Sequence, residues 1–205
     1  MDAAEWDARY SGTELVWSVE PNRFVEEECR SLRPGRALDV AAGEGRNAIW
    51  LAGLGWQVVA VDFSPVVLDK ARKLAERLGS GQSDALTWVC ADVRIWKSSP
   101  DAFDLVVIAY LHLPPAERRV VVQNSASALA PGGTILIVGH DRLNLTSGVG
   151  GPQDPVVLYS PSDLVADLAP IGELTIERAA TVERTTPAGV ALDAMVRAHR
   201  ERLVG

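Results

Sequence analysis

The sequence is poor in cysteine and in basic residues, and both shortages exclude classes of protein. Its 205 residues include only 2 cysteines, Cys29 and Cys90, too few for a disulfide framework or a cysteine metal site. Lys and Arg number 20 against 27 Asp and Glu, which leaves a net charge of -7. With so few cysteines, we expect both thiols to be reduced. Because nucleic-acid binding needs clustered cations, we expect no nucleic-acid partner.

Long apolar runs are also missing. No segment approaches the roughly 18 consecutive apolar residues of a membrane span. The N-terminal residues MDAAEWDARY lack the apolar core of a signal peptide. We therefore expect a cytoplasmic protein with no membrane partner. With 47% hydrophobic residues in a chain of this length, a single domain over residues 1–205 is the natural expectation.

Patterns typical of strands alternate with patterns typical of helices along most of the chain. Strands are predicted at residues 37–40, 58–61, 86–91, 103–109 and 134–138, and helices at 47–53, 66–78 and 114–129. Pro131-Gly132-Gly133 is expected to separate the third of these helices from the strand after it. Strands rich in Val, Ile and Leu that alternate with helices indicate a mostly parallel α/β sheet with both faces covered.

The C-terminal part of the chain breaks this alternation. After a predicted helix at 160–168, two strand patterns at 174–182 and 190–197 are joined by the short segment 185–189. Such a short connection requires antiparallel pairing, because a parallel return needs a crossover of a dozen or more residues. We predict a Rossmann-like, doubly wound, seven-stranded sheet that ends in an antiparallel hairpin.

A glycine-rich segment follows the first predicted strand. Residues 37–48 read ALDVAAGEGRNA, which places Asp39 at the strand end and Gly43 and Gly45 at the start of a helix. Bare backbone at a helix N-terminus suits the anionic part of a nucleotide-like ligand. Asp62 lies about 20 residues further on, the spacing of a carboxylate that binds ribose hydroxyls. These features alone fit either a nicotinamide dinucleotide or another nucleoside cofactor.

The chain resembles the class I S-adenosylmethionine-dependent methyltransferases over nearly its whole length. Their first motif matches Asp39-Val-Ala-Ala-Gly-Glu-Gly45, except that Ala41 stands at the first glycine position, which is acceptable if its φ is negative. The resemblance implies that Asp62 binds the ribose diol and that Asp92 accepts from the adenine amino group. The full set of cofactor contacts that it implies is Tyr10, Trp17, Asp39, Ala41, Gly43, Gly45, Asp62, Phe63, Ser64, Asp92, Val93 and Ala109.

The N-terminal segment resembles a narrower group within this class. The sequence EWDARYSGTELVWSVEPN is similar to the entry segment of the tellurite-resistance and thiopurine-type methyltransferases. This similarity implies that residues 1–33 form a helical lid and that residues 34–205 form the catalytic core. In such a lid, Trp17 would face the sulfonium of the cofactor. An amphipathic helix packed on the domain is the alternative.

Two of the three histidines follow predicted strand ends. His112 comes after the fourth strand and His140 after the fifth, where an open α/β sheet places its ligands. A hydroxyl acceptor needs a base in methyl transfer, so we expect both histidines to be catalytic, with His140 as the preferred base and His112 acting mainly on substrate binding. A thiolate or oxyanion acceptor would need no such base. His199 is expected at the surface or the sheet edge.

The segment after His140 bears a weaker similarity to the sugar O-methyltransferases of methylmannose polysaccharide synthesis. Asp141, Arg142 and Asn144 are its candidate substrate contacts. Asp141 could instead orient an imidazole or help to bind a divalent cation such as magnesium. No ligand spacing in the sequence demands a metal.

The sequence thus predicts an S-adenosylmethionine-dependent enzyme that methylates a hydroxyl of a small molecule, such as a sugar, as a monomer or homodimer. A thiol or tellurite-type methyltransferase is the alternative. A nicotinamide-dependent oxidoreductase and a non-catalytic cofactor-binding module fit the carboxylates and histidines less well.

Overall fold

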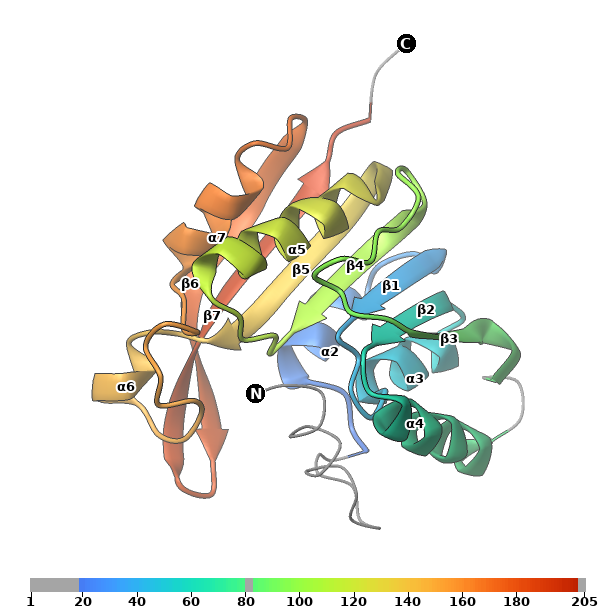
Figure 1. The fold of residues 1–205 in the computed structure, drawn as a ribbon, viewed down its shortest axis with the longest axis horizontal. Coiled ribbons are helices and arrows are strands. Elements are labelled where there is room, and N and C mark those ends of the chain that lie inside the picture. The colour runs from blue at the N-terminus through green and yellow to red at the C-terminus, as the bar shows by residue number, and fades with distance from the viewer. Residues whose placement is uncertain (1–18, 80–82, 203–205) are drawn as a thin grey trace. The chain divides into compact units, whose positions relative to one another are not determined.

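The computed structural model describes residues 19–79 and 83–202 (Figure 1). The chain forms two compact units, a first unit of Met1–Trp96 and a second unit of Lys97–Gly205. Tyr10 and Trp17 lie outside the described residues, as does most of the expected lid. The lid and the single domain over residues 1–205 therefore stay predictions.

The first unit contains three parallel strands in the order β3-β2-β1. Its elements are α2 (Arg23–Cys29), β1 (Arg36–Val40), α3 (Arg46–Gly53), β2 (Gln57–Asp62), α4 (Pro65–Leu78), the 3-10 helix η1 (Ser83–Ala85) and β3 (Leu86–Cys90). Strand β1 is buried from Ala37 to Val40, as expected for a strand covered on both faces. Asp39 and Asp62 therefore stand at the carboxyl ends of neighbouring parallel strands.

Local signals explain where the helices of the first unit begin. Ser64 caps α4 by accepting a hydrogen bond from the backbone N–H of Val67, and Pro65 occupies the first helical position. Asn22 caps α2 through the N–H groups of Phe24 and Val25. The backbone N–H of Asn22 also donates to Oδ1 of Asn47, which ties the start of α2 to α3.

The second unit contains four strands in the order β4-β5-β7-β6. Its elements are β4 (Phe103–Ala109), α5 (Pro115–Ser127), β5 (Leu129–His140), α6 (Asn144–Ser147), α7 (Pro161–Leu168), β6 (Leu174–Thr186) and β7 (Gly189–Arg200). Strand β4 pairs parallel to β5, whereas β7 is antiparallel to both β5 and β6. Helices α5 and α7 pack together over one face of these strands (Figure 1). The predicted seven-stranded, mostly parallel sheet with an antiparallel C-terminal hairpin is confirmed.

Two boundaries differ from the sequence prediction. Pro131-Gly132-Gly133 does not precede β5 but lies inside it, where the pairing with β4 shifts between Leu129 and Thr134. Proline donates no ladder hydrogen bond, and Gly132 has a φ of 83°, so the segment forms an irregularity in the strand rather than its boundary. The hairpin strands also extend further than predicted, leaving only Pro187 and Ala188 in the turn.

Candidate active site

The glycine-rich loop leads directly into helix α3 in the first unit. Gly45 is the N-cap residue, with a φ of 78°, and no side chain caps the helix. A Cβ on Gly45 would come within 2.5 Å of the Trp88 ring and 3.1 Å of Ala71 Cβ, so close packing here requires glycine. The helix N-terminus thus presents backbone without a side-chain cap, an arrangement that suits an anionic ligand group.

Ala41 does not have the negative φ that would make alanine acceptable at the first glycine position of the motif. Its φ is 56°, in the left-handed region, and not negative. A Cβ clashes with the backbone in this region, at a cost of roughly 1–2 kcal/mol for a residue other than glycine. The loop therefore keeps the backbone shape of the glycine-containing motif at the cost of local strain.

Asp39 is buried at the end of β1 with an incompletely satisfied carboxyl group. Its side-chain atom Oδ2 has no hydrogen-bond partner among the described residues. Burial raises the pKa of Asp39 to about 7, against the opposing effects of the Ala48 backbone N–H and of Arg46. A buried acceptor without a partner beside an uncapped helix N-terminus fits the ammonium and carboxylate groups of a bound amino acid moiety.

Asp62 is held rigidly at the end of β2. Its Oδ2 accepts a hydrogen bond from the backbone N–H of Gly43 at 2.9 Å, and Oδ1 accepts from the N–H of Ser64 at 3.0 Å. Carboxylate oxygens have further lone pairs, so these bonds orient the group and leave it able to accept from a diol. Ser64 itself is buried and serves as a helix cap.

Asp92 follows β3 and is only partly buried. Arg94 contacts both of its oxygens, with Nε at 3.0 Å from each and Nη2 at 2.7 Å from Oδ2. These hydrogen bonds lower the pKa of Asp92 despite its partial desolvation. Val93 is buried, and the carbonyl oxygen of Phe63 lies 3.7 Å from Sγ of Cys90, so residues 63 and 90–93 form one neighbourhood.

In the second unit, a histidine and a buried carboxylate meet across two strands. His140 ends β5, and the antiparallel register makes Asp193 of β7 its direct partner. Nδ1 of His140 lies 3.2 Å from Oδ1 of Asp193, whose side chain is fully buried, while the His140 side chain is 13% exposed. Gly151 covers the imidazole, since a Cβ there would lie 2.8 Å from its Cγ. This contact leaves Nε2 as the nitrogen that can exchange protons.

Asp193 is the centre of a larger polar cluster. Its Oδ2 accepts hydrogen bonds from the hydroxyl of Tyr110 at 2.6 Å and from Nε of Arg184 at 2.7 Å. Burial alone would raise the pKa of Asp193, but the contacts with His140, Arg184 and Tyr110 outweigh it and lower the pKa. The carboxylate is therefore charged and can hold a neighbouring imidazole in one tautomer and orientation.

His112 is held as a neutral ring beside His140. Its Nε2 accepts the backbone N–H of His140 at 3.1 Å, and its ring stacks on those of His140 and Tyr159 at centroid distances of 5.3 and 5.9 Å. Burial, reinforced by the nearby His140, lowers the pKa of His112 to about 4. His112 thus braces the end of β5 in the neutral form.

Residues 37–133 match the model of a family described as methyltransferase domain. The match covers β1 to the start of β5 and includes the glycine-rich loop, Asp62 and Asp92. The match indicates a methyltransferase domain in this part of the chain.

Similar proteins include methyltransferases with different acceptors. The chain is 31% identical over 148 residues to glycine N-methyltransferase of Mus musculus, covering 65% of this chain and 49% of that protein. It is 30% identical over 138 residues to tRNA 5-carboxymethoxyuridine methyltransferase of Escherichia coli strain K12, covering 66% of this chain and 52% of that protein. The chain thus spans about half the length of the curated relatives it matches.

A solved structure matches the fold over nearly the whole chain. It comes from work on the conversion of a disulfide bond into a thioacetal group during echinomycin biosynthesis, and it is 21% identical to this chain. The match has a TM-score of 0.73 and covers 99% of this chain and 94% of that chain. The shared fold therefore includes the C-terminal hairpin.

The three predicted substrate contacts, Asp141, Arg142 and Asn144, each make hydrogen bonds or an ion pair with other residues of the protein. Asp141 is buried, and its oxygens accept from the Leu143 N–H and the Thr181 hydroxyl rather than contacting an imidazole. Asn144 is also buried, and its amide bonds to the backbone of Val149, Gly150 and Leu192. Arg142 is exposed and pairs with Asp163 at 3.1 Å. Asp141 and Asn144 fix the loop that follows His140.

Sequence reasoning missed the partners of His140. Tyr110 follows Ala109 at the end of β4 and has a φ of 59°, an unusual conformation for a residue other than glycine. Asp193 stands alone in the otherwise apolar run VALDAMV, a signal that could have been noticed. Arg184 carries no comparable signal, because many arginines in strands are simply exposed.

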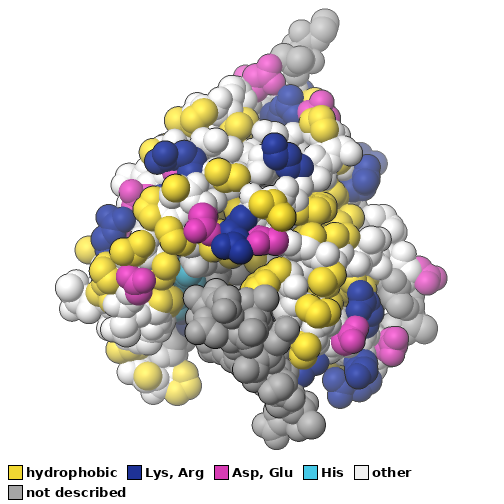
Figure 2. All heavy atoms as spheres, viewed as in Figure 1, with side chains coloured by type: hydrophobic (Ala, Val, Ile, Leu, Met, Phe, Trp, Pro, Cys, Tyr) yellow, Lys and Arg dark blue, Asp and Glu magenta, His cyan; other side chains and the backbone are white. Residues whose placement is uncertain are grey.

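No group of three or more His, Cys, Asp or Glu side chains that could hold a metal occurs in residues 19–79 and 83–202. In the same residues, no helix has the length and apolar character needed to cross a membrane. Acidic and basic side chains are interspersed among apolar ones on the face shown in Figure 2. Because the described residues hold no such group of metal ligands, side-chain geometry does not support magnesium binding.

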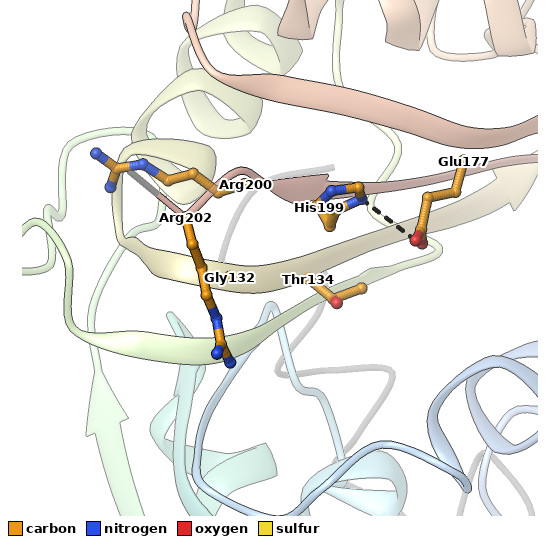
Figure 3. A pocket seen from close by; sticks show the side chains of 6 residues that line it. All are labelled: Gly132, Thr134, Glu177, His199, Arg200 and Arg202. Carbon is orange, nitrogen blue, oxygen red and sulfur yellow. Dashed lines mark ion pairs between the residues drawn. The ribbon is translucent and has the colours of Figure 1, made fainter. Parts of the chain in front are cut away.

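An open pocket of about 360 Å³ in the second unit lies near the start of β5 (Figure 3). Its lining residues are Gly132, Thr134, Glu177, His199, Arg200 and Arg202. The expectation that His199 lies at the surface or the sheet edge is wrong: it is a half-buried residue of β7, which pairs with both β5 and β6. Its Nδ1 lies 3.2 Å from Oε1 of Glu177. None of the predicted site residues lines this pocket.

Proposed function

We propose that the protein is an S-adenosylmethionine-dependent methyltransferase that methylates a hydroxyl group of a small molecule, with His140 as the general base. The observation that carries this proposal is the contact between His140 and the buried, charged Asp193. A thiolate or oxyanion acceptor would need no base of this kind, so the pair favours an acceptor that must lose a proton.

The first unit supplies the cofactor contacts in this proposal. Asp39 would accept from the ammonium group, the backbone from Gly43 to the start of α3 would bind the carboxylate, and Asp62 would accept from the ribose hydroxyls. Asp92 would accept from the adenine amino group, beside Val93 and Phe63. When bound, S-adenosylmethionine supplies an electrophilic methyl group on a sulfonium.

The second unit activates the acceptor. Nδ1 of His140 lies 3.2 Å from Oδ1 of Asp193, so a proton on Nδ1 would face the carboxylate and leave the lone pair on Nε2. Nε2 would take the proton of the acceptor hydroxyl and so make its oxygen nucleophilic, and the charge of Asp193 would stabilise the resulting imidazolium. His112, neutral and bonded to the backbone N–H of His140, acts as a positioning residue.

The charge of the chain and one of its relatives support a small-molecule acceptor. A formal charge of -7 disfavours a polyanionic acceptor, and glycine N-methyltransferase acts, by its name, on a small molecule. The similarity to a tRNA methyltransferase makes RNA the competing acceptor. The N-terminal similarity to tellurite-resistance and thiopurine-type enzymes makes thiols and tellurite the other class to test.

Two measurements test the proposal. Calorimetry should detect binding of S-adenosylmethionine and of its demethylated product but not of NAD, and Asp62→Ala should weaken binding by about 1.5–3 kcal/mol. A transfer assay with labelled methyl groups should then give product with sugar alcohols or hydroxy acids. NAD binding, or transfer to thiols, tellurite or RNA alone, would contradict the proposal.

A further inference from the structure

Arg184 occupies a distinctive position beside the proposed base. It lies on β6 near the tip of the C-terminal hairpin, two residues beyond Val182, the cross-strand partner of Asp193. This diagonal placement brings the guanidinium onto the Asp193 carboxylate, with Nε at 2.7 Å from Oδ2 and Nη2 at 3.4 Å from Oδ1. His140 and Arg184 are therefore neighbours across one carboxylate group.

The guanidinium of Arg184 is fixed in orientation by only part of its hydrogen-bond donors. Nε also donates to the Tyr110 hydroxyl at 2.9 Å, and the guanidinium carbon lies 5.4 Å from the centroid of the Tyr110 ring. Nη1 makes no hydrogen bond to any described residue, and the side chain is 25% exposed. An arginine held by one edge presents its remaining N–H groups to a ligand without further loss of side-chain freedom.

The net charge of the groups around Arg184 is compatible with binding of an anion. Asp193 and Arg184 offset each other, and Tyr110 binds as a neutral donor, so the cluster is close to neutral while His140 is neutral. Burial opposes the charge on Arg184, but its bonds to Asp193 raise its pKa, so it stays a cation. Proton transfer to His140 then adds a positive charge that an acceptor anion would offset.

We propose that the methyl acceptor carries an anionic group, a carboxylate in the simplest case, which Nη1 of Arg184 binds while the acceptor hydroxyl meets His140. This inference rests on the proposed function and narrows its substrate class to hydroxy acids. Guanidinium binds carboxylates in preference to neutral amides because its N–H groups make charge-assisted hydrogen bonds.

The test compares acids with their amides, which share shape but not charge. Affinities of lactate and lactamide, and of para-hydroxybenzoate and its amide, are measured by calorimetry on the protein saturated with S-adenosylhomocysteine. In at least one pair, the wild-type protein should bind the acid about 10- to 100-fold more tightly than the amide. Equal affinities within both pairs, including no binding of any member, overturn the inference.

Variants locate the effect. Arg184→Gln should abolish the preference for the acid, and Arg184→Lys, which keeps the charge but not Nη1, should retain only part of it. Arg119→Gln is the matched control, because Arg119 is an exposed arginine that pairs with a buried carboxylate, Asp167, on α7. A preference that survives Arg184→Gln, or is lost equally in Arg119→Gln, overturns the inference.

Turnover separates this inference from the proposed function. Methylation of neutral hydroxyl compounds without any preference for acids would contradict the role of Arg184 and leave the proposed function standing. Acid binding that depends on Arg184, with methyl transfer to thiols alone, would support the anion site and contradict hydroxyl methylation.

Discussion

His140 and Asp193 face each other across β5 and β7, with Nδ1 of the imidazole 3.2 Å from Oδ1 of the carboxylate. Asp193 is fully buried and also binds Tyr110 and Arg184, so its own position is fixed by three side chains. A carboxylate fixed beside Nδ1 favours the tautomer with the proton on Nδ1, which leaves Nε2 free to act as a general base.

Replacing Asp193 by asparagine should impair catalysis more than cofactor binding. The amide still fills the space but cannot stabilise an imidazolium, so turnover should fall by about two orders of magnitude. Calorimetry with S-adenosylmethionine should give a nearly unchanged affinity. Asp154→Asn, at an exposed carboxylate that accepts from the Val156 N–H, is the control. Full turnover in a folded Asp193→Asn protein would show that His140 does not depend on this carboxylate.

Asp39 should make the cofactor-free protein less stable as the pH rises. The folded pKa is about 7, above the unfolded value of 3.8, so folding favours the protonated acid. Stability is therefore lost between these two values and is constant above them, with a total loss of roughly 4 kcal/mol. Asp39→Asn should remove this loss.

Urea unfolding at pH 5 and pH 8 checks the effect of Asp39. The variant should gain more stability over the wild type at the higher pH, while binding S-adenosylmethionine more weakly because the ammonium group loses its charged acceptor. A gain that does not grow between the two pH values would contradict the shifted pKa.

His112 should produce the opposite trend in the acid range. Its folded pKa of about 4 lies below the unfolded value of 6.5, so its contribution to stability is complete above the unfolded value and is lost as the pH falls toward 4. The loss amounts to roughly 3 kcal/mol. His112→Gln should flatten the decline in the unfolding free energy over this range. A decline as steep as that of the wild type would refute the neutral, buried state of His112.

Ala41→Gly should stabilise the protein. Glycine relieves the strain of a φ of 56°, and after its own entropic cost a net gain of roughly 1 kcal/mol is expected in urea unfolding. Ala52→Gly in α3 is the matched control and should destabilise by about 1 kcal/mol, because this residue has a helical backbone. A loss of stability in Ala41→Gly would show that the loop relaxes without strain.

Much of the fold could be predicted because its signals are local. The alternation of apolar strands with capped helices, such as Ser64-Pro65 before α4, depends on neighbouring residues alone. The antiparallel end of the sheet followed from the short connection before β7. Pro131 and Gly132 were misleading, because pairing with β4 overrides their usual role as strand breakers.

The candidate site was predictable only in part. The residues at strand ends can be located from the local sequence, whereas the partners of His140 depend on strand pairing. Asp39 and Asp62 lie at strand ends, positions that the sequence pattern reveals. Asp193 meets His140 through the register of β5 with β7, a pairing between residues far apart in the chain. Asp141 and Asn144 likewise make contacts with residues far along the chain, Thr181 and Leu192. The carboxylate beside the His140 imidazole is Asp193 and not the adjacent Asp141.

The most direct test of the account is the rate of methyl transfer to a hydroxyl acceptor by the wild type and by His140→Gln, followed with labelled S-adenosylmethionine. The account predicts transfer by the wild type and a loss of about two to four orders of magnitude in the variant, with unchanged affinity for S-adenosylhomocysteine. Near-normal turnover in a folded His140→Gln protein would contradict base catalysis by His140, and no transfer by the wild type to any hydroxyl compound would contradict the proposed function itself.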